Sequence, residues 1–299
     1  MTITNKQHTH LLDHGYVVIP RFVPPADLKV AQRALQQYFP SPALLTAKPH
    51  HYKHITESPD FQQIEFPYTE HALNQMAVHP KLIALAEKLL ATREVMLSRS
   101  SLWAKYAGLG EFEQEMHVDY EGNTLVAPRD DGDYRQINLI LYYSDVDETL
   151  GPTNVLSQQF TRDDPLWPPF RPREKWPQFY ENSTNILAKA GDLLVFSMRT
   201  FHRATSLTAG FGARFTQHLI YRGKRHLFQG YQHWPSFGEQ AELQSFLERA
   251  SVRQREALGF PSPGDPYWNE HTLAAVATRY PGMDMAPYRR GTRRGKPVR

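Results

Sequence analysis

One short motif and two later residues carry the chemistry that stands out in this sequence. The motif is His117-Val118-Asp119, and His202 and Arg214 follow it downstream. Residues i and i+2 of a strand point to the same face, so His117 and Asp119 could offer a nitrogen and an oxygen to one ion. With His202 added, two imidazoles and one carboxylate would leave three open positions on an octahedral metal, the arrangement that suits Fe(II). A chelating cosubstrate would need two of those positions and dioxygen the third.

The motif is weak when it is taken alone. In a chain with 14 His and 31 Asp plus Glu, a His-x-acid pair is expected by chance, and a lone strand histidine is more often a satisfied polar residue. Arg214 adds weight, because a hairpin after His202 would return it to the same cavity. There its guanidinium could grip a carboxylate of the cosubstrate with two hydrogen bonds. The alternative is a surface arginine beside Arg222 and Arg225.

Composition limits the remaining classes of function. The 34 basic and 31 acidic residues give a net charge of +3, so no overall field favours nucleic acid. There is no cysteine, which excludes disulfides, thiolate metal sites and cysteine nucleophiles, and fits a cytoplasmic protein. The N-terminal residues have no apolar stretch typical of a signal peptide, and no apolar run approaches the length of a membrane span.

Elements that could position these residues follow from hydrophobic periodicity. The pattern predicts a strand over 15–23 and helices over 24–39 and 70–90, the latter broken at Pro80. Residues 41–67 have the composition of a loop. Strands are then predicted within 95–106, 135–146, 185–202 and 213–222, and a helix over 237–258. Helices first, strands second and a helical extension last favour a β-sandwich or barrel with helices packed outside.

Residues 157–185 contain five prolines and no periodicity, which predicts a structureless loop of the kind that often forms a lid. Its basic residues Arg171, Arg173 and Lys175 could attract an anionic substrate, but solvated charge is the simpler expectation.

Several motifs together resemble the phytanoyl-CoA dioxygenase family of Fe(II)- and 2-oxoglutarate-dependent oxygenases. In chain order they are GYVVIPRFVPPADLKVAQRAL, MHVDY, NLILYYSDVDETLGPTNVLSQQ and AGDLLVFSMRTFHRATSLTAGFGARFTQHLIYR. The last is the most specific, because it joins a Gly-Asp turn, an apolar strand, the distal histidine and the arginine at the family's usual interval. Together the motifs cover about residues 10–225.

The resemblance implies a mainly β fold with flanking helices around a double-stranded β-helix, a jelly-roll of the cupin type. It implies that His117, Asp119 and His202 bind iron and that Arg214 binds the far carboxylate of 2-oxoglutarate. Further cosubstrate or pocket contacts are expected from a second set of residues, namely Thr205 or Ser206, Lys105, Asn138 and Tyr142. The division that follows is an oxygenase domain over 1–225, a helical extension over 226–288 and a basic flexible tail over 289–299.

The implied cofactors are Fe(II), 2-oxoglutarate and O2, and the implied reaction is oxidation of a small molecule with release of succinate and CO2. A secondary-metabolite intermediate is one candidate substrate. Because Asp119 occupies the position that related halogenases leave open for chloride, hydroxylation is favoured, with desaturation or ring formation as variants. Two alternatives stay open: a non-catalytic ligand-binding barrel and a metal-dependent cupin-like isomerase or hydrolase. The extension could cover the mouth of the pocket or form a homodimer contact.

Overall fold

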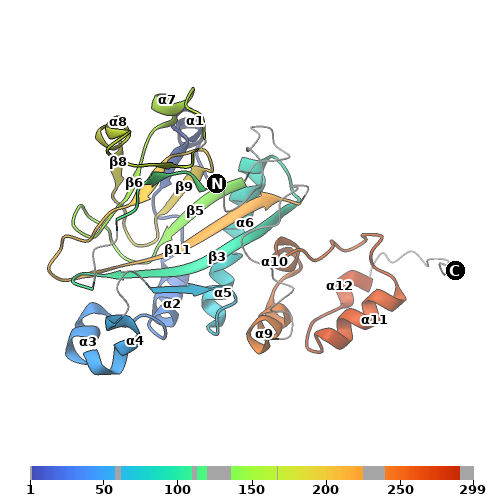
Figure 1. Ribbon diagram of the computed structural model, residues 1–299. Helices are drawn as coiled ribbons and strands as arrows, with labels where there is room; N and C mark the ends of the chain where they lie inside the picture. The colour runs from blue at the N-terminus through green and yellow to red at the C-terminus, as the bar shows by residue number, and fades with distance from the viewer. Residues whose placement is uncertain are drawn as a thin grey trace.

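The computed structural model describes residues 2–57, 62–109, 113–119, 136–166, 168–224 and 240–289 (Figure 1). Its helices are α1 (Asn5–His14), α2 (Pro25–Leu35), α3 (Pro42–Ala47), the 3-10 helix η1 (Pro49–Tyr52), α4 (Lys53–Thr56), α5 (His71–Ala77), α6 (Pro80–Leu90), α7 (Gln158–Thr161), α8 (Pro177–Glu181), α9 (Ala241–Arg249), α10 (Val252–Ala257), α11 (Glu270–Arg279) and α12 (Ala286–Arg289). Its strands are β1 (Tyr16–Ile19), β2 (Gln62–Glu65), β3 (Val95–Tyr106), β4 (Met116–His117), β5 (Gln136–Tyr142), β6 (Thr153–Val155), β7 (Phe170–Arg171), β8 (Thr184–Ile186), β9 (Leu193–Ser197), β10 (His202–Ala204) and β11 (Ala213–Gly223).

The strands form two antiparallel sheets that pack face to face. One has six strands in the order β1-β9-β5-β11-β3-β2, and the other has five in the order β7-β4-β10-β6-β8. Ile140 and Leu194 of the six-stranded sheet share a buried apolar cluster with Val155 and Ile186 of the five-stranded sheet. This cluster fills the space between the sheets, so the expected β-sandwich with helices outside is confirmed.

The outer face of the six-stranded sheet carries the main hydrophobic core. Successive side chains of a strand alternate between faces, and on β5 Ile137, Leu139 and Leu141 belong to this outer core. Helices cover it: α6 begins with Pro80 and buries an apolar stripe at helical spacing, formed by Leu82, Leu85, Ala86 and Leu89. The inner face of the same sheet is therefore left to face the five-stranded sheet and the functional residues.

Two segments differ from the sequence expectation. Residues 41–67, expected to be loop, contain α3, η1, α4 and β2, because Ser41 caps a helix that begins at Pro42. Residues 157–185 are not a structureless lid but contain α7, β7 and α8 and enter β8. Arg171 is not solvated there: it is 2% exposed and donates to the Phe170 and Pro165 carbonyls. Its guanidinium also packs on the Trp176 and Phe201 rings.

The chain also begins with a helix that periodicity did not predict. Thr4 and Gln7 form a capping box at the start of α1, in which each side chain bonds the other residue's backbone. α1 packs against β1 and α7.

The C-terminal helices continue the main core rather than forming a core of their own. Leu243 and Phe246 of α9 belong to the same buried cluster as β3 and β11, and the Phe246 ring meets Phe66 edge-on at 6.1 Å. Helix α9 and α10 match the helical region expected over 237–258. The basic tail beyond Arg289 lies outside the described residues. Of the helices described, none has both the length and the hydrophobicity needed to cross a membrane.

Candidate active site

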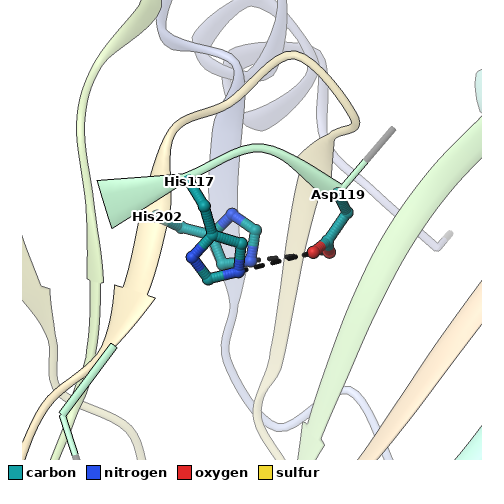
Figure 2. A group of neighbouring side chains, drawn as sticks. All are labelled: His117, Asp119 and His202. Carbon is teal, nitrogen blue, oxygen red and sulfur yellow. Dashed lines mark ion pairs between the residues drawn. The ribbon is translucent and has the colours of Figure 1, made fainter. Parts of the chain in front are cut away.

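His117, Asp119 and His202, here called the triad, converge at one point of the five-stranded sheet. His117 ends β4 and lies directly opposite His202, the first residue of β10, with ring centroids 4.5 Å apart. Asp119 follows two residues later and turns its carboxylate toward both rings (Figure 2). Each His Nε2 lies 3.5 Å from an Asp119 oxygen. One ligand atom from each side chain lies within 4.8 Å of the others, so these three could hold one metal ion.

Both imidazoles are oriented by the backbone of their own strand. His117 Nδ1 lies 2.8 Å from the Glu115 carbonyl, and His202 Nδ1 lies 3.0 Å from the Thr200 carbonyl. A carbonyl oxygen can only accept, so each Nδ1 carries the proton and each Nε2 presents its lone pair to the common point. The tautomers that a metal requires are therefore fixed before any ion arrives.

The charge of the triad also suits a cation. Burial lowers the pKa of His202 to about 4, so the ring is neutral near pH 7. Burial alone would raise the pKa of Asp119, but the two neighbouring imidazoles, His202 first and then His117, outweigh it and hold that pKa well below its usual range. Asn138 Nδ2 donates to Asp119 Oδ2 at 3.1 Å and fixes the carboxylate. Metal binding requires both imidazoles to be neutral, and with one carboxylate they would then form a monoanionic donor set.

Aromatic rings enclose the triad on two sides. Phe170 stacks on His117 with centroids 5.6 Å apart, and Phe196 lies 4.6 Å from the His202 ring. An apolar cluster that includes Met116, Val118 and Phe201 packs around the same strands. His117 and His202 are 8% and 7% exposed, whereas the Asp119 side chain is 31% exposed, so the carboxylate side of the triad is the more open one.

Two buried cations lie on the facing sheet. Arg214 of β11 and Lys105 of β3 are direct cross-strand partners and are 5% and 4% exposed. Arg214 donates to the Gly151 carbonyl, and Lys105 Nζ donates to the Thr205 carbonyl at 3.0 Å. Gly151 has a φ of +63°, and a Cβ there would come within 2.8 Å of the Thr205 carbonyl, so this turn requires glycine. Burial, followed by the nearby Arg214, lowers the pKa of Lys105 to about 7.

The other residues expected from the sequence gather around these cations. The Thr205 hydroxyl donates to the Pro152 carbonyl at 2.7 Å, and half-buried Ser206 follows it. Tyr142 is fully buried, and its hydroxyl donates to Thr153 Oγ1 at 3.4 Å. Burial raises the pKa of Tyr142, so its phenol is neutral.

One histidine that the sequence analysis did not identify lies between the triad and the cation pair. His218 of β11 stacks on Trp103 of β3 with centroids 4.8 Å apart. Burial holds the pKa of His218 well below its usual value, Arg99, Arg214 and His202 lower it further, and Asp119 opposes them. It therefore interacts electrostatically with both the triad and the cation pair. The signal was available, since His218 is four residues from Arg214 and thus on the same strand face.

The sequence model of the phytanoyl-CoA dioxygenase (PhyH) family matches residues 11–214. No curated protein matches the chain. Similar solved structures include the non-haem alpha-ketoglutarate-dependent carbocyclase SnoK from nogalamycin biosynthesis, 16% identical with a TM-score of 0.56, where the match covers 74% of this chain and 84% of that chain. HygX from Streptomyces hygroscopicus, solved with nickel and 2-oxoglutarate bound, is 14% identical with a TM-score of 0.55 over 75% of this chain and 88% of its own.

EctD from S. alaskensis in its apoform is 17% identical with a TM-score of 0.56, over 78% of this chain and 83% of that chain. These likenesses confirm the expected mainly β, cupin-like fold with flanking helices. The family match spans more than half of the 299 residues and covers the triad and Arg214. The chain therefore belongs to the phytanoyl-CoA dioxygenase family.

Proposed function

We propose that the chain is an Fe(II)- and 2-oxoglutarate-dependent dioxygenase that hydroxylates a small molecule, with iron held by His117, Asp119 and His202. The observation that carries the proposal is the convergence of these donor atoms within 4.8 Å of one another. Two imidazoles and one carboxylate on one face of a metal leave the remaining positions open for a chelating cosubstrate and O2. When bound, iron and 2-oxoglutarate would activate O2, one of whose oxygen atoms would go to the substrate C–H carbon and the other to succinate, with release of CO2.

The cation pair supports the assignment of the cosubstrate. Arg214 and Lys105 lie on the six-stranded sheet, whereas the triad lies on the five-stranded sheet. A dicarboxylate could chelate the metal with one end and reach Arg214 with the other, because a guanidinium binds a carboxylate with two parallel hydrogen bonds. Thr205, Ser206 and Tyr142 would offer hydroxyl groups to the same carboxylate.

Neighbouring residues would position and shield the reaction. Asn138 holds the Asp119 carboxylate, and the Phe170 and Phe196 rings pack against the two histidines. With iron bound, the Asp119 carboxylate would take the metal position that chloride would need, which favours hydroxylation over halogen transfer. The similar structures include a carbocyclase and an epimerase, and one HygX structure contains hygromycin B. A compact natural product is therefore the substrate class that we propose.

The test is aerobic turnover of the Fe(II)-loaded protein with 2-oxoglutarate and a deproteinised metabolite extract. We expect succinate formation that needs Fe(II) and O2, is lost in Asp119→Ala and is kept in Asp163→Ala, which changes an exposed aspartate. Mass spectrometry of the extract would then assign the outcome. Gain of one oxygen atom supports hydroxylation, loss of two hydrogens indicates desaturation or ring closure, and unchanged mass indicates epimerisation.

The same assay separates the alternatives. A ligand-binding barrel would bind 2-oxoglutarate and form no succinate with any extract. A metal-dependent isomerase or hydrolase would change the extract without consuming 2-oxoglutarate. Either result would overturn the oxygenase proposal.

A further inference from the structure

A cavity of about 400 Å³ lies beside the triad, where α1, α6 and α7 meet the ends of β5 and β9. Its volume falls within the range of small-molecule binding sites. Leu11 and Leu12 of α1 and Leu89 of α6 provide apolar walls, together with Phe196 and Met198. Among the described residues that line it there is no aspartate or glutamate. The lining therefore favours a neutral or anionic molecule with an apolar body over a cation.

This cavity is connected to the triad through shared neighbours. Phe196 lines it and also contacts the His202 ring, with centroids 4.6 Å apart. Gln136 lines it from the start of β5, two residues before Asn138 and thus on the same face of the strand. Asn138 in turn donates to Asp119. No triad residue is among the described residues that line the cavity, so a molecule in it would lie one side chain away from His202, across Phe196.

Gln136 is the residue in the lining that points to a ligand. It is 4% exposed, and its amide Nε2 has no hydrogen-bond partner among the residues that the structure describes. Leaving a buried donor unsatisfied costs about 1–3 kcal/mol, so such groups usually have a partner that arrives with a ligand or a water molecule. Gln158, a second glutamine in the lining, instead donates to Thr200 Oγ1 at 3.2 Å.

We propose that this cavity binds the primary substrate and that Gln136 is a specificity-determining residue within it. The substrate is a compact amphipathic molecule whose apolar part packs on Leu11, Leu12 and Phe196. An oxygen atom of the substrate, from a carbonyl, hydroxyl or carboxylate, accepts a hydrogen bond from the Gln136 amide. The proposal rests on the proposed function only for the identity of the occupant as substrate, because the cavity and its unsatisfied donor exist without iron.

The test uses a matched pair of probes, acetophenone and ethylbenzene, which differ in one acceptor oxygen. Their binding to the anaerobic Fe(II)- and 2-oxoglutarate-loaded protein is measured by ligand-observed NMR. Gln136→Met keeps the length of the side chain and removes the amide, and Gln37→Met, at an exposed glutamine outside the lining, is the control. We expect Gln136→Met to weaken acetophenone relative to ethylbenzene by about fivefold, the size of one hydrogen bond, and Gln37→Met to leave the ratio unchanged.

A second variant changes the wall of the cavity that helix α1 forms and leaves the β-sheets unaltered. Leu12 is 60% exposed on α1, so Leu12→Trp should fill the cavity and abolish binding of both probes without unfolding the chain. Leu187→Trp, at a leucine that is 48% exposed and outside the lining, should leave binding intact. Bound acetophenone should also show line broadening with Fe(II) that disappears with Zn(II), because Fe(II) is paramagnetic.

Each outcome has a separate meaning. An unchanged probe ratio in Gln136→Met would show that water alone satisfies this amide and would overturn its role. Binding that survives Leu12→Trp would place the probes elsewhere and overturn the cavity assignment. Failure of the proposed function would look different: acetophenone would still bind the metal-free protein and respond to Gln136→Met, but Fe(II) would produce no broadening.

Discussion

The two sheets of this barrel are built in contrasting ways. In the six-stranded sheet, β3 and β11 have 12 and 11 residues and pair along almost their whole length above the main core. In the five-stranded sheet no strand exceeds three residues, yet this sheet carries His117 and His202. The cation pair thus lies on an extended ladder, whereas the triad depends on local contacts. Substitutions in the triad and substitutions in the cation pair should therefore impair different functions, metal binding in the first case and 2-oxoglutarate binding in the second.

Side chains compensate for the short ladder around the triad. The Tyr180 hydroxyl accepts from the Met116 backbone amide at 3.0 Å and donates to the Arg171 carbonyl at 2.7 Å. The Arg173 and Arg203 guanidiniums pack on the Tyr180 ring, and Glu113 accepts from both. The segment expected to be a lid therefore supports the strand that presents His117.

Removing a triad side chain should have the largest effect and should leave the cation pair intact. We expect His117→Ala to weaken divalent metal binding by more than about 100-fold. Changes at residues that only orient the metal ligands lower the affinity by about 10- to 100-fold, and loss of a ligand should exceed that range. The unfolding temperature of the metal-free protein should change little, because the main core is on the other sheet. Calorimetric titration with Ni(II) measures the affinity. The exposed His50, altered to alanine, is the control.

The converse change is Arg214→Met on the six-stranded sheet. Loss of a charged hydrogen-bonded contact should weaken 2-oxoglutarate binding by about 10- to 100-fold. Metal affinity should stay at the wild-type value, since no triad residue touches this side chain among the contacts described. Equilibrium binding of 2-oxoglutarate to the metal-loaded protein checks this, with exposed Arg33→Met as the matched control. Loss of metal binding as well would mean that the two functions are not separable.

Tyr180→Phe tests whether local contacts hold the short strand. It removes one hydroxyl and leaves the Met116 amide without its acceptor, at a cost of about 1–3 kcal/mol in stability. Metal affinity should fall by about tenfold, the lower end for a residue that positions a ligand. Thermal unfolding measures the loss of stability, and metal titration measures the loss of metal affinity. Tyr267→Phe, at a 45% exposed tyrosine, should change neither.

The smallest effect concerns pH and Lys105. Its pKa of about 7 means that the amine is cationic below pH 7 and neutral above it. The cationic form of Lys105 attracts the 2-oxoglutarate dianion. The affinity for 2-oxoglutarate should therefore be constant below about pH 6 and fall about fivefold between pH 6 and 8. This factor corresponds to a charge interaction of ~1 kcal/mol. His202, with its pKa of about 4, does not titrate there. Lys105→Met should hold the affinity at its alkaline value throughout; a persistent slope would assign it to another group.

The sequence predicted those features that depend on strand periodicity. The apolar strands before His202 and around Arg214 followed from periodicity. The convergence of the triad was predicted by the family resemblance, because the motif is weak when taken alone and Asp119 lies beyond the end of β4. The segments 41–67 and 157–185 were mispredicted, because their helices have six residues or fewer, and caps and tertiary contacts rather than periodicity decide such short helices. The burial of Arg171 depends on rings from Trp176 and Phe201, which no local pattern reveals. Gln136 was missed for the same reason, since its unsatisfied amide is a property of packing.

The central claim is that the triad and Arg214 together hold Fe(II) and 2-oxoglutarate. The most direct measurement is an anaerobic titration of the Fe(II)-loaded protein with 2-oxoglutarate, followed by visible absorption. We predict a metal-to-ligand charge-transfer band in the wild type and in Asp163→Ala, and none in Asp119→Ala. A wild-type protein that binds Fe(II) and shows no band at saturating 2-oxoglutarate would contradict the account.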